Sequence, residues 1–269
     1  MTDGPPSPLT RRVWSDLQRH LTADPSPEGL ARALRHLAKW RAHLLTNTHR
    51  ARSGDRIAQG PFAGMVYDVA ASEGGALPRL LGTYEAALHP VIAEIVAARP
   101  ARIIDLGCAE GYYAVGLARL LPETEIIARD SDPTARERCA RLAAANGVAE
   151  RIAIGGAVDA EALNTLLTPG AVLICDIEGG EDALLDPGAV PALAGADILV
   201  EAHDCFHPGL AARLAARFAA THDVRRIERS APAAPLPDWM DALSDLDRAL
   251  ALWEWRAGPT PWLWMRARR

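Results

Sequence analysis

The stretch IIDLGCAEGYYAVGLARL, residues 103–120, places an acid and two glycines between a β-branched run and a helical pattern. Asp105 ends the predicted strand, and Gly107 and Gly111 lie in the turn that follows. Glycine allows the main chain of such a turn to approach a ligand closely. A dinucleotide site needs Gly-x-Gly-x-x-Gly and a helix N-terminus for the pyrophosphate. Here the acid would repel a diphosphate but could pair with a cationic amine, so NAD is the weaker interpretation.

A second acid follows at the spacing of a nucleoside site. The run EIIARD ends at Asp130, about 20 residues beyond the glycine turn, where a carboxylate can accept hydrogen bonds from two ribose hydroxyls. The alternative for Asp130 is a helix N-cap or a surface acid. Asp132 is the better N-cap, because Pro133 follows it at the first helical position. We therefore predict that Asp105 and Asp130 contact one ligand.

Two later strand ends carry groups suited to proton transfer or metal binding. AVLICDIEGGE places Asp176, Glu178 and Glu181 at the end of one predicted strand, and ILVEAHD places Glu201 and His203 at the end of the next. Side chains alternate along an extended segment, so Glu201 and His203 share one side. Ligands of open α/β sheets bind at the carboxyl ends of strands. These groups are therefore expected to meet at one mouth.

A strand–helix alternation from residue 102 onward positions all of these residues. Short apolar β runs separated by helices favour an α/β, Rossmann-like, doubly wound sheet of seven mainly parallel strands with an antiparallel last strand. Residues 1–76 are predicted to form an N-terminal helical extension, and residues 77–269 the ligand-binding domain. The predicted strands are 102–106, 124–129, 151–155, 171–176, 197–202, 222–228 and 261–267. Helices are predicted over 77–99 and near 111–120, 133–146, 159–167, 180–194, 208–220 and 238–253.

The acid-x-Gly-x-x-x-Gly turn resembles motif I of class I S-adenosyl-L-methionine (SAM) methyltransferases, in which the turn wraps the amino-acid portion of SAM. The segment SDPTARERCARLAAANGVAERIAI looks like the second helix, Asn-Gly turn and third strand of that family. The resemblance implies that SAM is the cofactor. It also implies a set of cofactor-binding residues, with the last two against the adenine: Asp105, Gly107, Cys108, Gly111, Asp130, Ser131, Ala157 and Val158.

Within that class, residues 80–207 resemble the FkbM-type methyltransferase family, known mostly for O-methylation of natural products and sugars. GTYEAAL, GCAEGYYAVGLA, DIEGGE and the later Glu-x-His carry the likeness. Two features depart from it. Asp130 and Ser131 stand where the family usually has Glu-Pro, and the first 75 residues and the Trp-rich tail have no counterpart. The resemblance implies O-methylation of a small molecule, at a natural-product or sugar-like hydroxyl.

Two mechanisms are open at the expected mouth. His203 suits a general base that takes the hydroxyl proton, since the unperturbed pKa of histidine is about 6.5. Alternatively, Asp176, Glu178 and Glu201, with or without His203, hold Mg²⁺ or another divalent ion that acidifies the hydroxyl. The non-catalytic readings are a core histidine bonded to backbone and acids that cap the next helix. Glu181 has the spacing of such a cap.

Composition narrows the remaining classes. An apolar content of 49%, four scattered cysteines without a CxxC pair, and no signal-peptide core or membrane-length apolar run predict a cytoplasmic protein without membrane association. Residues 1–56 hold ten basic and five acidic side chains, and since the whole chain carries −5, the remainder carries −10. A negative body disfavours nucleic acid as a partner.

Other functions stay open at this point. The basic N-terminal region could dock a protein or RNA substrate for methylation, or the protein could be a non-catalytic SAM-binding regulator. The N-terminal helices are expected to act as a lid or as a contact in a homodimer. The Trp-rich tail could line a pocket, form a subunit interface or belong to the core, and the core is favoured for Trp262 and Trp264 because they alternate with Leu263 and Met265.

Overall fold

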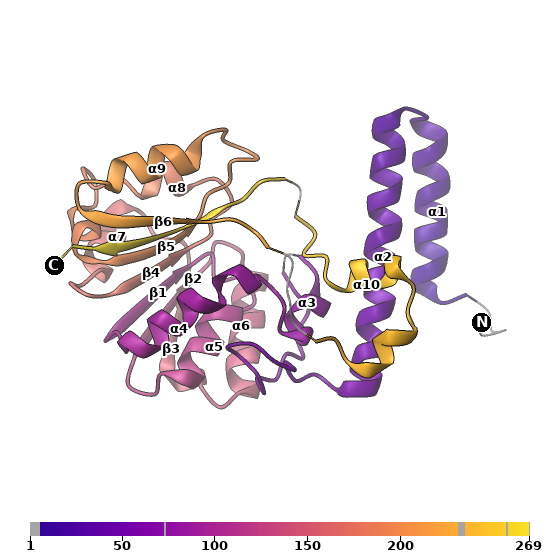
Figure 1. Ribbon diagram of the computed structural model, residues 1–269, viewed down its shortest axis with the longest axis horizontal. Coiled ribbons are helices and arrows are strands. Elements are labelled where there is room, and N and C mark those ends of the chain that lie inside the picture. Colours follow the sequence, from indigo (N-terminus) through magenta and orange to yellow (C-terminus); the bar gives the residue numbers. More distant parts are fainter. Residues whose placement is uncertain (1–5, 73, 231–234, 257, 269) are drawn as a thin grey trace.

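The computed structural model describes residues 6–72, 74–230, 235–256 and 258–268. Figure 1 shows a sheet with helices on both faces and a pair of long helices standing beside it. Within the described ranges no helix is long and apolar enough to cross a membrane.

The central sheet has seven strands in the order β3-β2-β1-β4-β5-β7-β6. β7 is antiparallel to both of its neighbours, and the pairs among the first five positions are parallel. The predicted mixed sheet is thus confirmed, and the winding reverses between β1 and β4, where ligands of such sheets bind. The strands are β1 (Arg102–Leu106), β2 (Glu125–Arg129), β3 (Ile152–Gly155), β4 (Val172–Cys175), β5 (Asp197–Glu201), β6 (His222–Ile227) and β7 (Trp262–Ala267).

Helices cover both faces of the sheet, which explains why its central strands are apolar throughout. One apolar core includes Ile103, Trp262 and Trp264, and the other includes Ile104 and Leu263, so alternate residues of one strand enter opposite cores. The predicted core position of the two tryptophans is confirmed. One face carries α4 (His89–Ala98), α5 (Tyr112–Leu120) and α6 (Pro133–Ala145), and the other carries α7 (Ala160–Leu166), α8 (Glu181–Leu184) and α9 (Leu210–Phe218).

Three predicted helices are wrong in extent, because each predicted segment is divided into shorter pieces. The segment 77–99 divides into α3 (Ala76–Leu81), a 3-10 turn and α4. Gly82 causes this break: it has φ 67°, and a Cβ there would lie 1.9 Å from the carbonyl oxygen of Gln59. The segment 180–194 begins with α8, continues as an irregular stretch that contains Pro187, and ends in a 3-10 turn that starts at Pro191. The segment 238–253 divides into a 3-10 turn and α10 (Asp245–Ala251), which Ser244 caps.

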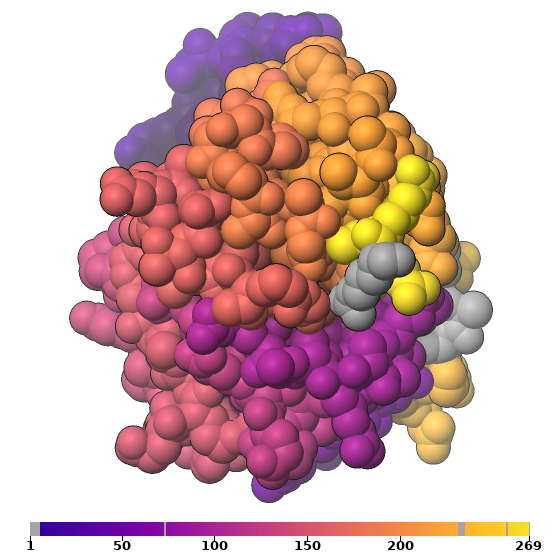
Figure 2. Space-filling view, turned by 90° about the vertical axis from the view of Figure 1, so that its left-hand side faces the viewer, coloured from indigo at the N-terminus to yellow at the C-terminus, as the bar shows by residue number. Residues whose placement is uncertain are grey.

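The N-terminal hairpin consists of α1 (Pro8–Ala23) and α2 (Pro27–Ser53), each begun by a serine cap followed by proline. It stands beside the sheet in Figure 1 and rises past the body at the top of Figure 2. α2 ends at Gly54, and beyond it Ile57, Phe62 and Tyr67 already pack into the core under α4 and α5. Packing into this core thus begins just after Gly54, within the segment 1–76 that the sequence predicts as a helical extension.

Candidate active site

The glycines of the turn after β1 serve the packing of the chain itself. Gly107 has φ 77°, and a Cβ there would lie 1.6 Å from the carbonyl oxygen of Asp176 at the end of β4. Gly111 has φ 94°, and a Cβ there would lie 2.7 Å from the sulfur of Cys139 in α6. A side chain at either position would collide with a neighbouring element, so both positions require glycine. Because both are glycine, the turn can stay close to the sheet.

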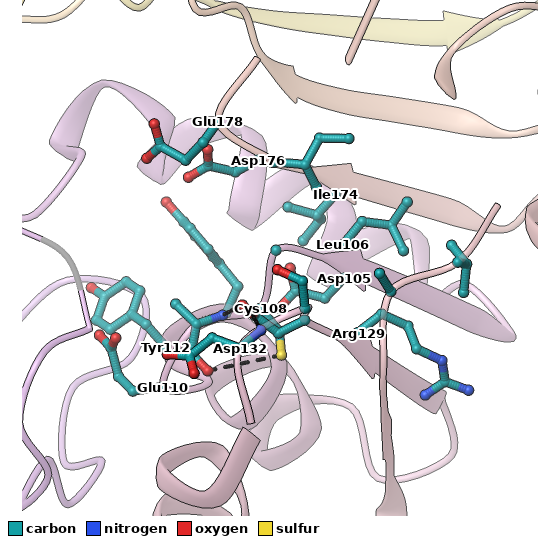
Figure 3. A pocket seen from close by; sticks show the side chains of 18 of the residues that line it. Asp105, Leu106, Cys108, Glu110, Tyr112, Arg129, Asp132, Ile174, Asp176 and Glu178 are labelled. Carbon is teal, nitrogen blue, oxygen red and sulfur yellow. Dashed lines mark hydrogen bonds between the residues drawn. The ribbon is translucent and has the colours of Figure 1, made fainter. Parts of the chain in front are cut away.

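A first cavity of about 480 Å³ opens over the carboxyl ends of β1, β2 and β4, a size typical of small-molecule sites (Figure 3). The structure brings all but one of the predicted cofactor-binding residues to it. The exception is Gly111, which faces α6. The predicted residues that line the first cavity are Asp105, Gly107, Cys108, Asp130, Ser131, Ala157 and Val158.

Asp105 is a buried and incompletely hydrogen-bonded acid of the first cavity. Its side chain is only 3% exposed, and its Oδ2 has no hydrogen-bond partner within the described residues. Burial, with a further contribution from the charge of Asp130, raises the pKa of Asp105 to about 7. A buried carboxylate that lines a cavity in this way is suited to a ligand that brings a cation.

Asp130 joins the end of β2 to the glycine turn. Its Oδ2 accepts from the N–H of Ala109 at 2.9 Å, and its Oδ1 accepts from the N–H of Asp132 at 2.8 Å. Ala109 has φ 48°, a left-handed conformation that this bond supports. Each carboxylate oxygen keeps a second lone pair for a ligand hydroxyl. Asp132 accepts from the N–H of Thr134, so it is the helix cap that the sequence predicted.

Glu110 belongs to this region, although the sequence analysis did not identify it. It is fully buried, accepts from the hydroxyl of Tyr67 at 2.6 Å, and pairs with Nε of Arg79 at 3.0 Å. Burial alone would raise the pKa of Glu110, but Arg79, Tyr67 and the N–H of Ser72 together lower it. The Arg79 guanidinium lies 3.8 Å from the ring centre of Tyr84. This network fixes the chain before α4 against the first cavity. The only signal of Glu110 in the sequence was an acid within a turn of small residues.

A second cavity of about 400 Å³ adjoins the first. Tyr84, Asp176 and Glu178 line both cavities and therefore form a shared wall. The remaining walls come from distant parts of the chain: Lys39 of α2, Ala71, Ser72 and Gly74, the end of β5 with Glu201, His203, Cys205 and Phe206, and the tail segment with Glu254, Trp255, Arg256 and Thr260.

His203 stands at the centre of the predicted catalytic residues. Its ring is buried, and its Nδ1 lies 2.9 Å from Oε1 of Glu181. Its Nε2 lies 3.3 Å from Glu178 Oε2, 3.6 Å from Asp176 Oδ1 and 3.7 Å from Glu201 Oε2. The four predicted catalytic residues therefore meet at one point, beside the shared wall.

Glu181 holds both the histidine and the loop. Besides His203, its Oε1 accepts from the N–H groups of Ile177 and Gly179, so the acid with the spacing of a cap organises the turn after β4. That turn includes Glu178 at φ 54°, a left-handed conformation rare for glutamate. Such strain is typical of functional sites, where surrounding contacts enforce it. The bonds of Glu181 are the contacts that enforce it here.

The carboxylates around His203 favour the protonated forms of the side chains in this cluster. Burial lowers the pKa of His203, but the hydrogen bond to Glu181 and the charges of Glu201 and Glu178 raise it overall. Burial and the neighbouring Glu201 raise the pKa of Asp176 well above its ordinary value. The cluster therefore retains protons readily and is suited to a positively charged species.

Arg256, also missed from the sequence, brings a positive charge from the tail segment into the second cavity. Its guanidinium pairs with Glu201, Glu85 and Glu254, and Glu85 in turn accepts from the hydroxyl of Tyr113. Burial, partly offset by Arg256, raises the pKa of Glu85 to about 7. The predicted metal set was Asp176, Glu178 and Glu201. The donor atoms that the structure brings within 4.8 Å of one another belong to Asp176, Glu178 and His203, while Glu201 is engaged by Arg256.

Comparisons with known proteins give structural matches only. No family model and no curated protein matches the chain. The chain is similar to an O-methyltransferase, TomG, from Streptomyces achromogenes in complex with SAM, at 15% identity and a TM-score of 0.45, over 84% of this chain and 89% of that chain. It is also similar to an O-methyltransferase from Bacillus cereus in complex with SAH, at 9% identity and a TM-score of 0.44, over 65% and 78%.

A third match is the C-terminal domain of precorrin-6Y C5,15-methyltransferase from Rhodobacter capsulatus, at 22% identity and a TM-score of 0.44, over 67% of this chain and 89% of that chain. TM-scores below 0.5 carry no argument about activity. The two cavities and the residues between them are therefore the observations that bear on the function.

Proposed function

We propose that the protein is a SAM-dependent methyltransferase that methylates a hydroxyl of a small molecule. The observation that carries this proposal is the pair of adjoining cavities with the shared wall of Tyr84, Asp176 and Glu178. Methyl transfer needs a donor and an acceptor bound side by side with a narrow opening between them. The first cavity fits the donor, and the second fits the acceptor.

The residues of the first cavity match the parts of SAM one by one. The unpartnered oxygen of Asp105 would receive the ammonium of the amino-acid portion, and the spare lone pairs of Asp130 would receive the ribose hydroxyls. Ala157 and Val158 offer apolar surface for the adenine. When bound, SAM supplies an electrophilic methyl group on a sulfonium.

His203 is proposed as the general base. With Nδ1–H donating to Glu181, its Nε2 is the free ring nitrogen and faces the shared wall. It would take the proton as the acceptor oxygen attacks the methyl carbon. The new C–O bond forms as the C–S bond breaks, leaving S-adenosylhomocysteine and protonated His203. The carboxylates around Nε2 stabilise the imidazolium that results.

A divalent metal is the alternative to a general base in this proposal. Asp176, Glu178 and His203 would hold it, because two carboxylates and an imidazole converge there and Glu181 orients the ring as a carboxylate commonly does for a metal-bound histidine. A bound Mg²⁺ or similar ion would acidify the acceptor hydroxyl. His203 would then be a ligand, and the proton would leave to solvent.

Binding and turnover are tested in sequence. S-adenosylhomocysteine should raise the melting temperature of the wild type and NAD(P) should not, with Asp105→Asn reducing the shift and the exposed Asp223→Asn leaving it intact. SAM is then incubated with a panel of small hydroxylated acceptors, with and without EDTA, and product is followed by mass spectrometry. Stabilisation by NAD(P) alone contradicts the proposal. Binding of S-adenosylhomocysteine with no methyl transfer to any acceptor class would favour a regulatory SAM-binding role.

A further inference from the structure

One side of the N-terminal hairpin exposes a row of large apolar side chains. Of the eight large hydrophobic residues exposed in the described parts of the chain, five lie in α1 and α2. Their exposed fractions range from 42% to 69%. A single exposed leucine needs no explanation, but five such residues on one hairpin do. These five residues, called here the hairpin face, are Trp14, Leu21, Leu30, Leu34 and Leu37.

The five side chains share one side of the hairpin. Val13 and Leu17 of α1 pack against Ala33 of α2, which defines the direction in which the helices face each other. At 100° per residue, the exposed residues of α1 lie about 70° further round their axis than this contact, and the three leucines of α2 are rotated about 70° in the same sense. Because the two helices are antiparallel, equal rotations of the same sense turn both rows to the same side.

The hairpin face carries few charges. The helix positions beside it are filled by Thr10, Gln18, Ala31 and Ala38, with Arg11 at its edge. Arg41, one turn after Leu37 on the same side of α2, is paired with Asp247 of α10. The remaining charges of the upper hairpin follow the other side, among them Arg12, Asp16, Arg19, Arg32 and Lys39. A nucleic acid or an anionic membrane would need several available cations beside the apolar row, whereas this side offers Arg11 and an Arg41 that Asp247 already engages. An identical, mainly apolar face is the complementary surface.

We propose that two copies of this chain associate through the hairpin face and form an antiparallel four-helix bundle about a two-fold axis. A two-fold interface uses the same patch on both copies, and a two-helix hairpin with one apolar side is half of a four-helix bundle. One tryptophan and four leucines supply an apolar patch of a few hundred Å² per copy, the order of a standard interface once flanking residues are included.

The opposite side of α2 reaches the second cavity, so the bundle would hold part of the proposed acceptor site. Lys39 lines that cavity, with its Nζ 4.8 Å from the ring centre of Trp255. Arg35, one turn earlier, donates to the carbonyl of Trp255 and lies 5.5 Å from the ring centre of Trp253. α2 therefore clamps the tail segment that carries Arg256. Association of the hairpins would restrict the motion of this clamp.

The mass in solution tests the association directly. Sedimentation equilibrium of the full chain should give twice the chain mass of 28.8 kDa, and L30E/L34E should give a single chain. Leu120→Glu changes another exposed leucine, at the end of α5 on the body, and should leave the dimer intact. Circular dichroism checks that each variant is folded. Leu34→Ala provides a milder change and should raise the dimer dissociation constant about tenfold or more.

The outcomes separate this proposal from the enzymatic one. A monomeric wild type, or a dimer unaffected by both hairpin changes, overturns it. A monomeric wild type that binds anionic vesicles would assign the hairpin face to a membrane instead. Affinity for S-adenosylhomocysteine should be equal in wild type and L30E/L34E, since the first cavity has no hairpin residue on its walls. The double variant should also raise the KM for the acceptor severalfold. This second prediction rests on the proposed function, whereas the predicted mass does not.

Discussion

The two adjoining cavities are built in opposite ways. The first is lined almost entirely by turns that follow neighbouring strands of one sheet, so short stretches of sequence define it. The second draws one wall from Lys39 and another from Trp255 and Arg256, more than 200 positions away. The cavity proposed for the donor is thus determined by strand-end turns, while the cavity proposed for the acceptor depends on how the extension and the tail pack.

The cavities also differ in how their charges are satisfied. In the first, Asp105 is buried with an oxygen that no described residue engages, so a ligand cation would complete it. In the second, Arg256 already pairs with Glu85, Glu201 and Glu254. The first cavity is thus poised for a charged ligand, and the second is organised by its own ion pairs before any ligand binds.

The largest effect is expected at the second cavity. His203→Ala should lower kcat by about 10²–10⁴-fold, the usual contribution of a positioned general base, and leave the affinity for S-adenosylhomocysteine within about twofold. Steady-state kinetics and calorimetry measure the two quantities. The exposed His20→Ala is the matched control. An equal loss of donor affinity would show that the cavities are not separable, which would break the comparison.

The next effect concerns stability. Arg256→Ala should lower the free energy of unfolding by about 3 kcal/mol, because it leaves buried carboxylates without their cation. Urea denaturation followed by circular dichroism measures it. Arg248→Ala, which removes a more exposed ion pair on α10, should cost less than about 1 kcal/mol. Similar losses in both variants would argue against a preorganised second cavity.

Asp105→Asn should act in opposite directions on stability and on binding. Because the folded-state pKa of Asp105 is raised to about 7, the folded protein binds more protons than the unfolded chain between the two pKa values, and stability from this group falls as pH rises through that window. The variant should therefore be more stable than the wild type by about 2 kcal/mol at about pH 8, with the gap closing in acid.

Its donor affinity should be lower over the same range. In the wild type, S-adenosylhomocysteine should bind more tightly from about pH 6 to about pH 8 as Asp105 ionises, and the variant should lack this dependence. Calorimetry at several pH values provides the test. If the affinity of the variant for S-adenosylhomocysteine still depended on pH, the ammonium would have to bind at another acid.

The smallest effect lies at the base of the hairpin. His49 is fully buried, and neither ring nitrogen has a hydrogen-bond partner among the described residues. Burial lowers the pKa of His49, so the unfolded chain binds more protons below its ordinary value of about 6.5 and stability falls as pH drops through that region. His49→Leu should reduce the difference in melting temperature between mildly acidic and neutral pH. No change in that difference would locate the acid sensitivity elsewhere.

The sequence predicted what local rules determine. The strand from Ile103 to Asp105, the turn at Gly107 and the convergence of Asp176 and His203 follow from apolar runs and strand-end positions. Glu110 and Arg256 were missed because their partners are distant: Tyr67 lies 43 positions from Glu110, and Glu85 lies 171 positions from Arg256. Such pairs leave no spacing pattern in the sequence.

The extent of helices was likewise decided by packing. Gly82 ends α3 because the carbonyl of Gln59 occupies the space of a side chain, and this approach depends on a loop more than twenty residues earlier. The helical periodicity of the following residues continues across Gly82, so this periodicity could not reveal the break. The residues just after Gly54 are likewise polar in part, yet Ile57, Phe62 and Tyr67 among them enter the same core as α4 and α5.

A crystal structure of the protein with S-adenosylhomocysteine tests the central claim most directly. The account predicts the ammonium at Asp105, the ribose hydroxyls at Asp130, and the sulfur directed to the wall of Tyr84, Asp176 and Glu178. A first cavity that stays empty at saturating ligand, or one that takes the diphosphate of a dinucleotide instead, would contradict it.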